Sequence, residues 1–414
     1  MRSLAPIKLP GFSHLAGAYA ANELGNWIGE IALAVLVYDQ TGSPLATAAL
    51  FLGMQFAPGF LGQVLVARVE PAGTKLMLPL LYLAEAATFV ALAATADNFA
   101  LWLVVLLAAV DGTLAIGARA LTRASAAAVL KPHGLLREGN AIINVGFTGA
   151  GAVGPLLAGV AVATLGIETA LLLDAASFVL VAATLAAATS LPQVKAQPER
   201  WWARLGEGFS YVNGQPVLRR LMTMQAAAFV FFSLVLPIEI VYAKDTLDAG
   251  DSGYGALLSA WGVGMVFGSF VFLAGRRVPM GMLLFTSTLA VSVSYLGMAV
   301  AGTLAVACVA AALGGAGNGV QWVAVMSTVQ GLTNERFQAR VAGLLESIAV
   351  AMPGLGFVLG GVITAFFDPR AGFAVAGLGV LAVLLLAVPL LRGADWTGAG
   401  GPAATDEAVE PLNV

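Results

Sequence analysis

The residues best suited to chemistry are acids placed inside apolar segments. In the stretch NELGNWIGEIALAVLVYDQTGS (22–43), Glu23, Asn26 and Glu30 are spaced so that they share one face of a helix. Ionisable side chains inside a membrane are costly, and they face a cavity or the interior of a helix bundle. A carboxylate there can bind a proton on one side of the membrane and release it on the other. Glu30, the deeper acid, is therefore our first candidate for proton coupling and Glu23 is another; a structural hydrogen bond is the alternative for both.

Asp111 and Glu85 lie in the middle of two other apolar stretches. Asp111 precedes Arg119 by about two helical turns on the same side, which is too far for a direct ion pair along one helix. We expect Asp111 to face the bundle interior, and it is the strongest alternative to Glu30. Glu85 is a further coupling candidate, with packing or pairing to another helix as its alternative role.

Glu346 is the main acid in the core of the second half of the chain, shortly after Arg340. It is the last coupling candidate, and it can line a cavity or close a gate at the inner side. Glu239 and Asp174 fall nearer the ends of their apolar stretches. For these two acids we expect contact with interfacial water.

Amides and aromatic rings within the apolar stretches are the candidates for substrate recognition. They are Asn22, Asn26, Gln55, Asn144, Gln225, Phe229, Asn318, Gln321 and Trp322, with Met54 and Phe232 as apolar partners. The stretch GGAGNGVQWVAVMSTVQG (314–331) is unusually polar for a helix that faces lipid. This mixture suits an amphiphilic molecule that is uncharged or cationic, and helix packing is the alternative role for each residue.

Residue types needed for enzyme chemistry are scarce. The sequence has one cysteine and two histidines, His14 and His133, so it offers no metal-binding cluster and no disulfide within the chain. It also lacks the Gly-x-x-x-x-Gly-Lys-Ser/Thr loop that holds nucleotide phosphates. We expect no enzyme activity, metal, cofactor or nucleic-acid partner, and we expect energy from a gradient of protons or another ion.

The composition places these residues in a membrane. Hydrophobic residues make up 59% of the chain and charged residues 10%, with a mean hydropathy of +0.89, whereas a soluble domain has about 25% charged residues. The apolar stretches are continuous and long enough for helices that cross a bilayer, which need about 20 residues. We therefore predict an all-α membrane protein with twelve transmembrane helices. The predicted spans are roughly 16–38, 45–66, 77–95, 99–121, 139–163, 168–189, 221–243, 254–274, 279–299, 303–330, 341–366 and 371–391.

The basic residues predict the orientation of these spans. When the N-terminus is placed inside, all of the 20 lysines and arginines except Lys244 and Arg370 fall on the inner side. Such a bias follows the positive-inside rule. Both termini should therefore be cytoplasmic in a multi-pass protein of the bacterial inner membrane.

An internal repeat predicts two six-helix halves. The second and eighth predicted spans match in length and in the basic residue that follows, and Gly154 and Gly159 are spaced like Gly356 and Gly361. Duplicated halves are typical of transporters with a site between the halves. The predicted divisions are an N-terminal bundle (1–190), a cytoplasmic linker that can hold an interfacial helix (191–220), a C-terminal bundle (221–392) and a disordered cytoplasmic tail (393–414).

Several short motifs occur in an order that resembles the major facilitator superfamily, and within it the branch of enterobactin exporters and macrolide-efflux permeases. The motifs are Gly25-Asn26-Trp27, Thr41-Gly42-Ser43, Ala118-Arg119, Asn140-Ala141 and Gly154-Pro155. Each motif alone is weak, but their order is specific and the resemblance covers residues 12–392. It implies a fold of two six-helix bundles and a central cavity lined by the first span.

The chain departs from that branch at two places. Members usually carry Gly-x-x-x-Asp-Arg between the second and third spans, but Ala67 stands here where the acid is expected, and Glu70 can replace it. Asn26 stands in place of the usual aspartate of the first span, and an amide carries no proton. The resemblance implies contacts between helix ends at an inner gate, which we assign to Arg68, Glu70, Arg119, Arg276 and Arg340.

The fifth span resembles the small-residue and proline motif of antiporters in this superfamily, with Gly154, Pro155 and Gly159. Small residues let helices approach closely, and proline removes a backbone hydrogen bond and bends the helix. We expect Gly356 and Gly361 to pack in the same way in the second half. The resemblance implies export rather than import, and ordinary packing is the alternative.

These observations favour a monomeric secondary transporter. We predict a proton-coupled efflux antiporter that works by alternating access on an amphiphilic drug-like or siderophore-like compound. The lack of a dense basic lining weighs against a strictly siderophore-specific pump. Two alternatives stay open: uptake of a small metabolite and, in another class, a receptor or assembly protein of the same fold that transports nothing.

Overall fold

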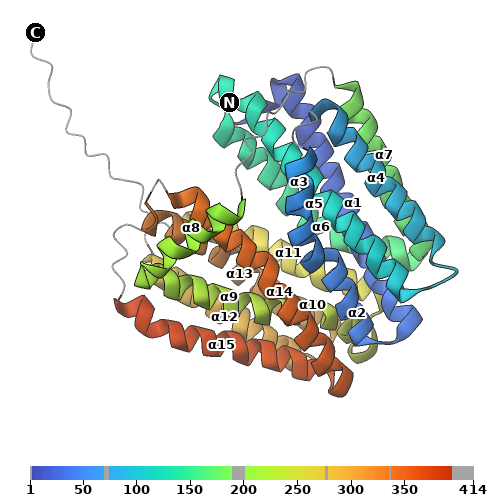
Figure 1. Ribbon diagram of the computed structural model, residues 1–414. Helices are drawn as coiled ribbons and strands as arrows, with labels where there is room; N and C mark the ends of the chain where they lie inside the picture. The colour runs from blue at the N-terminus through green and yellow to red at the C-terminus, as the bar shows by residue number, and fades with distance from the viewer. Residues whose placement is uncertain (1, 70–73, 189–200, 276–277, 335–336, 394–414) are drawn as a thin grey trace, which may run out of the picture.

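The computed structural model describes residues 2–69, 74–188, 201–275, 278–334 and 337–393, some of them, such as Arg68, by their backbone alone. The described elements are helices, which confirms the all-α prediction (Figure 1). The α-helices are α1 (Pro10–Thr41), α2 (Pro44–Phe51), α3 (Ala57–Val69), α4 (Thr74–Ala94), α5 (Leu101–Leu130), α6 (Leu136–Leu165), α7 (Ile167–Ala187), α8 (Trp201–Asn213), α9 (Pro216–Leu234), α10 (Leu236–Val241), α11 (Gly250–Ala274), α12 (Met280–Val300), α13 (Leu304–Leu332), α14 (Gln338–Phe366) and α15 (Pro369–Gly393). Two π-helical turns, η2 (Leu52–Phe56) and η5 (Tyr242–Thr246), join α2 to α3 and extend α10.

Eleven segments of the described chain are long and apolar enough to cross a membrane. Helix α1 has 32 residues but is not among them, because its polar face lowers its mean hydropathy. The predicted count of twelve spans therefore stays a prediction, whereas a multi-pass membrane protein is established.

The sequence Thr41-Gly42-Ser43-Pro44 makes the turn between α1 and α2. Gly42 adopts the left-handed conformation (φ 56°) that closes helix α1. Ser43 then caps α2 by accepting a hydrogen bond from the Ala46 amide, and Pro44 occupies the first helical position. Each residue of this motif thus has a local structural role.

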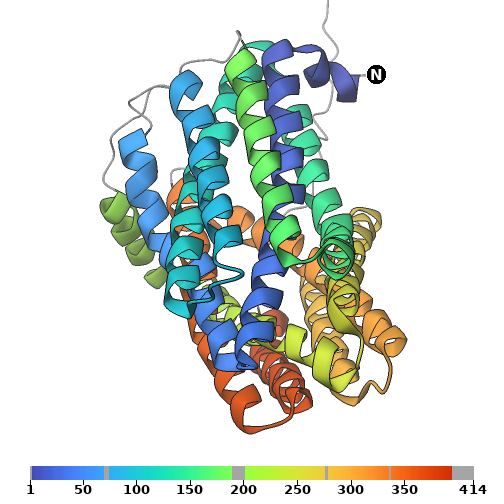
Figure 2. The ribbon, with the colours of Figure 1, turned by 90° about the vertical axis from the view of Figure 1, so that its right-hand side faces the viewer.

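The helices pack as two groups, which we call the first group (α1–α7) and the second group (α9–α15). Helix α1 lies against α6 and α7 in the first group, and Figure 2 shows α7 alongside it. In the second group α13 packs against α11 and α12, and α14 against α9. The predicted domain boundaries stay a prediction, because residues 189–200 and 394–414 lie outside the described residues.

The two groups meet mainly through five helices. Helix α2 contacts α10 and α14, and α6 contacts α11. We call the end that carries the turn between α1 and α2 (41–44) the closed end, and the end that carries the N-terminus the open end. Figure 1 shows the groups together near α2 and α10 and diverging toward the N-terminus.

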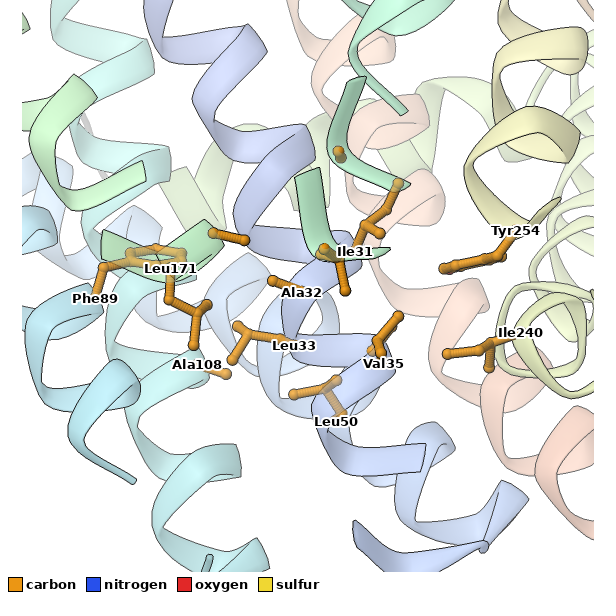
Figure 3. Close-up of a cluster of buried hydrophobic side chains, with 14 of the residues drawn as sticks. Ile31, Ala32, Leu33, Val35, Leu50, Phe89, Ala108, Leu171, Ile240 and Tyr254 are labelled. Atoms are coloured by element: carbon orange, nitrogen blue, oxygen red, sulfur yellow. The ribbon is translucent and has the colours of Figure 1, made fainter. Parts of the chain in front are cut away.

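Helix α1 is enclosed by both groups toward the closed end. Its residues 31–38 are all buried, and a helix that is apolar on every side is buried on every side. Figure 3 shows Leu50, Ala108 and Leu171 around it from the first group, and Tyr254 and Ile240 reaching toward it from the second. Glu30 directly precedes this sealed segment.

Helices α6 and α11 approach closely around a proline. Pro155 has no amide hydrogen to offer the Gly151 carbonyl, and a Cβ at Gly262 of α11 would overlap that carbonyl oxygen. The next amide, that of Leu156, donates instead to Ser259 Oγ of α11 at 2.7 Å. Helix α11 thus approaches the backbone of α6 closely at the proline and bonds to the amide that follows it.

Candidate functional site

Glu30 is held by a residue from the π-helical turn η2. Gln55 Nε2 donates to Glu30 Oε1 at 3.3 Å. The turn can lie so close to α5 because Gly53 sits against Val105 and Gly112 sits against the Met54 carbonyl. Single π-helical turns occur often at functional sites, since they redirect one side chain. Here the turn carries Gln55, which meets the acid on α1.

Nearer the open end, the polar face of α1 meets two arginines of α5. Glu23 is 4% exposed, and its Oε1 lies 3.8 Å from Arg119 Nε. Arg123 Nη2 donates to the Tyr19 hydroxyl at 3.2 Å and lies over the Tyr19 ring. The charge of Arg119 also acts on Glu30. Arg119, predicted for an inner gate, is thus the partner of Glu23.

Three more acids of the first group lie on α4, α5 and α7: Glu85 and Asp174 are fully buried, and Asp111 is half-buried. Glu85 is fully buried, and neither of its carboxylate oxygens has a hydrogen-bond partner among the described residues. The charge of Asp111 acts on both Glu85 and Asp174. Ser177 donates to Asp174 Oδ1 at 3.2 Å. Asp111 and Glu85, both chosen from sequence, thus lie on two helices that pack together, α5 and α4.

The expectation that Asp174 and Glu239 meet interfacial water is wrong. Asp174 is fully buried and Glu239 is 8% exposed. The carboxylate of Asp174 fits directly against Gly25 and Gly29, where α1 lacks side chains and α7 can approach. Glu239 lies on α10, which contacts α1 and α2 at the junction of the two groups. Position within a span did not reveal either environment.

The substrate candidates of the first group differ in their surroundings. Asn22 is buried and Asn26 is half-buried on α1, and Asn22 Oδ1 and Asn26 Nδ2 have no partner among the described atoms. Asn144 is exposed on α6. Gln55 is the residue of this set that contacts a coupling candidate directly.

In the second group, Gln225 is 9% exposed, and Phe229 packs edge-to-face on Trp322 with ring centroids 6.3 Å apart. Gln321 instead donates to Thr288 Oγ1 at 3.1 Å, which ties it to α12. Asn318 is half-buried, and Glu346 is exposed on α14. Two pockets of about 320 and 590 Å³ lie elsewhere, at α1 with α7 and at the closed end.

Most residues of the predicted inner gate lie outside the part of the chain that the structure describes. Glu70 and Arg276 are outside the described residues, as is the side chain of Arg68. Arg340 Nε bonds Glu207 Oε2 of α8 at 2.8 Å, a partner that the sequence analysis missed. The helix predicted in the linker is present as α8, which packs on α14 and α9; its place at a membrane surface stays a prediction.

The glycines of the repeat occupy corresponding places in the two groups. A Cβ at Gly154 would lie 2.8 Å from Trp27 of α1, and one at Gly356 would overlap Ser233 of α9, so each faces the first helix of its own group. Gly159 lies against α11, and Gly361 against Ala48 of α2, so each faces the other group. The helices α6 and α14 thus play equivalent parts in the two groups.

A cluster of charged residues joins the two groups at the closed end. The sequence analysis did not predict it. Lys244 of η5 binds Asp39 of α1, and its Nζ also lies 2.7 Å from Asp251 Oδ1 of α11. The Tyr38 hydroxyl donates to Asp245. We call Tyr38, Asp39, Lys244, Asp245 and Asp251 the outer clamp. The signal in the sequence was Lys244, one of two basic residues predicted outside.

Lys244→Gln is expected to loosen the closed end modestly. Partly exposed ion pairs contribute about 0.2–1 kcal/mol, so the population of the closed end should fall by up to about fivefold relative to the alternative. Spin labels at Gln40 and Ser252, in a variant without Cys308, would report this as a longer distance in pulsed paramagnetic resonance. Lys131→Gln at the exposed turn after α5 is the matched control. An unchanged distance distribution for Lys244→Gln would show that the outer clamp does not stabilise the closed end.

Comparison with known proteins identifies the family of this chain. The sequence matches the family described as transmembrane secretion effector over residues 1–349. It is 27% identical over 265 residues to the multidrug efflux pump Tap of Mycobacterium tuberculosis and Mycobacterium bovis, covering 62% of this chain and 61% of that protein. The chain thus spans less than two thirds of the length of these relatives.

Solved transporters share the fold. The nucleoside transporter NupG has a TM-score of 0.73 at 13% identity, covering 92% of this chain and 99% of its own. The POT family transporter PepTSo has a TM-score of 0.74 at 9% identity, covering 93% and 98%. The fold that holds Glu30, Gln55 and the outer clamp is therefore shared with these transporters. The chain is a member of the transmembrane secretion effector family, a membrane transporter of the major facilitator type.

Proposed function

We propose that this protein is a proton-coupled efflux antiporter for amphiphilic small molecules. The observation that carries the proposal is the position of Glu30. It is a half-buried acid that accepts a hydrogen bond from Gln55, and it directly precedes the buried segment 31–38, which both groups enclose toward the closed end. An ionisable residue inside a membrane is a candidate for a functional site, because burying it there is costly.

The polar face of α1 gives protons a route to Glu30. Asn22, Glu23 and Asn26 precede it on the same face, and Asn22 and Asn26 keep unpartnered polar atoms that can hold water. Arg119 at Glu23 places a positive charge beside this route. Glu23 is paired with the cation Arg119, whereas Glu30 accepts its hydrogen bond from the neutral amide of Gln55, so we infer that Glu30 is the acid that exchanges protons.

Alternating access would use the contacts between the groups. The outer clamp and the pairs α6 with α11 and α2 with α14 hold the closed end together. When these contacts separate and the open end closes, a substrate bound between the two groups would face the opposite side of the membrane. The basic residues of the open end, among them Arg123 and Lys131, support a cytoplasmic orientation for it.

Efflux is favoured over uptake by the similarity to the Tap pump, which is a multidrug efflux pump. The small residues around Pro155 also support export, because they resemble the antiporter motif of the superfamily. The amide and aromatic candidates Gln225, Phe229 and Trp322 suit an amphiphilic substrate. The bacterial inner membrane is the location that this function requires.

Expression in a bacterial host deleted for its own efflux pumps tests the proposal. Growth inhibition and accumulation are measured over a panel of amphiphilic compounds with wild type, Glu30→Gln and Asp111→Asn. We expect wild type to lower accumulation of at least one compound, and a proton uncoupler to restore it. Increased accumulation would indicate uptake, and no change over the panel would favour a protein that does not transport.

A further inference from the structure

A polar pocket at the closed end takes no part in the proton route on α1. Its volume is about 590 Å³, within the roughly 300–1,000 Å³ of pockets that hold small molecules. The first group contributes Tyr38, Gly42 and Pro44 to the wall, and the second group contributes residues of α10 and η5 and of the turn between α14 and α15. Because both groups form the wall, the pocket is complete only while the closed end is closed.

Charged side chains of both signs line this pocket without pairing with each other. Asp245 and Asp368 are exposed acids, and Arg370 is half-buried. None of the three forms a salt bridge with a described residue. Asp368 Oδ1 accepts a hydrogen bond from the backbone amide of Arg370 at 2.7 Å, and the guanidinium makes a long contact of 3.5 Å with the Ala299 carbonyl. The pocket therefore offers two carboxylates and one guanidinium to a molecule that enters it.

Hydroxyl groups complete the polar lining. Tyr38 donates its hydroxyl hydrogen to Asp245, and Thr246 is a further lining residue. Thr364 of α14 also lines the pocket and is 8% exposed, and its Oγ1 has no hydrogen-bond partner among the described residues. A buried polar group without a partner costs about 1–3 kcal/mol, and a hydrogen bond to a bound molecule would remove that cost. Thr364 thus points to a polar occupant independently of the charges.

We propose that this pocket binds a small zwitterion, a molecule with a primary ammonium group and an anionic group, and that the bound molecule stabilises the closed end. The ammonium group has three N–H donors for Asp245 and Asp368, and the guanidinium of Arg370 can hold a carboxylate or a phosphate through two parallel hydrogen bonds. A molecule that binds only the closed arrangement raises its population, so it slows a cycle in which the closed end must open. Tyr38 at the pocket lies about two helical turns of α1 beyond Glu30. This regulatory site is therefore separate from the coupling site, and it goes beyond the proposed function because it acts on transport in either direction.

Calorimetric titration of purified protein in phosphatidylcholine nanodiscs tests the site with a matched series of probes. The unbranched amino acids from glycine to 6-aminohexanoate carry both charges, whereas alkanoates and alkylamines of the same lengths carry one. Wild type should bind at least one amino acid about tenfold more tightly than both of its singly charged counterparts, which corresponds to about 1.4 kcal/mol. Arg370→Gln should lower the affinity for that amino acid to the affinity for the alkylamine. The alkylamine itself should bind this variant within about twofold of wild type, which also shows that the variant is folded.

Asp368→Asn is the second variant. Asparagine can still accept the Arg370 amide and cap α15, but it carries no charge, so the amino acid and the alkylamine should both bind more weakly. Glu168→Gln, at an exposed position at the start of α7, is the matched control and should bind all probes as wild type does. The site is overturned if every amino acid of the series binds wild type no more tightly than its singly charged counterparts, or if Arg370→Gln weakens the alkylamine as much as the amino acid.

Two further measurements test the effect of the bound molecule and identify its source. A saturating amino acid should raise the fraction of the short distance between the Gln40 and Ser252 labels, and an unchanged distribution would contradict the proposed stabilisation of the closed end. Titration in phosphatidylethanolamine nanodiscs distinguishes a free molecule from a lipid headgroup that carries the same two charges. An unchanged affinity identifies a free zwitterion as the occupant, and a lowered affinity identifies the headgroup as its competitor in the pocket.

Discussion

Glu30→Gln is expected to abolish uphill efflux while leaving the fold in place. Glutamine keeps the size of the side chain and can still accept a hydrogen bond from Gln55, but it cannot take up or release a proton. One charge moving through 100 mV is worth about 2.3 kcal/mol, which supports roughly a 50-fold concentration ratio. The variant should lose that ratio. Steady-state uptake by energised inside-out membrane vesicles measures it.

Two matched variants make this result specific. Glu168→Gln removes an exposed acid and should leave the concentration ratio unchanged. Asp111→Asn removes the alternative coupling candidate, which is half-buried on α5. If Asp111→Asn abolished the ratio and Glu30→Gln retained it, the coupling site would lie among the acids of α4, α5 and α7 and our assignment would be wrong.

Gly262→Val is expected to open the closed end and to stop transport. A Cβ at this position would overlap the Gly151 carbonyl and lie 2.9 Å from the Ala152 Cα, and both contacts are with the backbone of α6. Overpacking costs about 1–3 kcal/mol, so the closed arrangement should become about 5- to 150-fold less populated. The Gln40 and Ser252 spin labels should then show a longer distance, and efflux should fall with it.

Gly149→Val is the control for this variant. Gly149 lies on α6 with no atom near the place of a Cβ, so the substitution changes helix propensity without a clash. It should retain efflux and the short distance between the labels. A Gly262→Val protein with normal efflux and an unchanged distance would show that close approach of α6 and α11 is not needed for the transport cycle.

The sequence predicted the helices and the polar face of α1 because both depend on local pattern. Apolar stretches of sufficient length specify helices in a membrane, and the spacing of Glu23, Asn26 and Glu30 specifies their common face. The Thr41-Gly42-Ser43 motif likewise marks a turn through short-range backbone preferences. Such features are determined by residues that lie close together in the sequence.

The remaining features depend on contacts between distant segments. The bond from Gln55 to Glu30 requires a π-helical turn that is accommodated by Gly53 and Gly112 on two helices. The burial of Asp174 depends on glycines of α1, far away in the chain. Glu239 and the outer clamp lie where the two groups meet. The sequence of one group does not indicate which residues of the other group it contacts there. Pairing across the molecule is therefore what the sequence analysis missed.

Proton movement in proteoliposomes tests the central claim most directly. Purified protein is reconstituted with a pH-sensitive dye inside, a pH gradient is imposed, and the most strongly exported compound of the panel is added outside. The account predicts that the compound accelerates proton flow down the gradient with wild type, and that Glu30→Gln loses this response. Proton flow that does not respond to the compound in wild type, or that responds equally in Glu30→Gln, would contradict it.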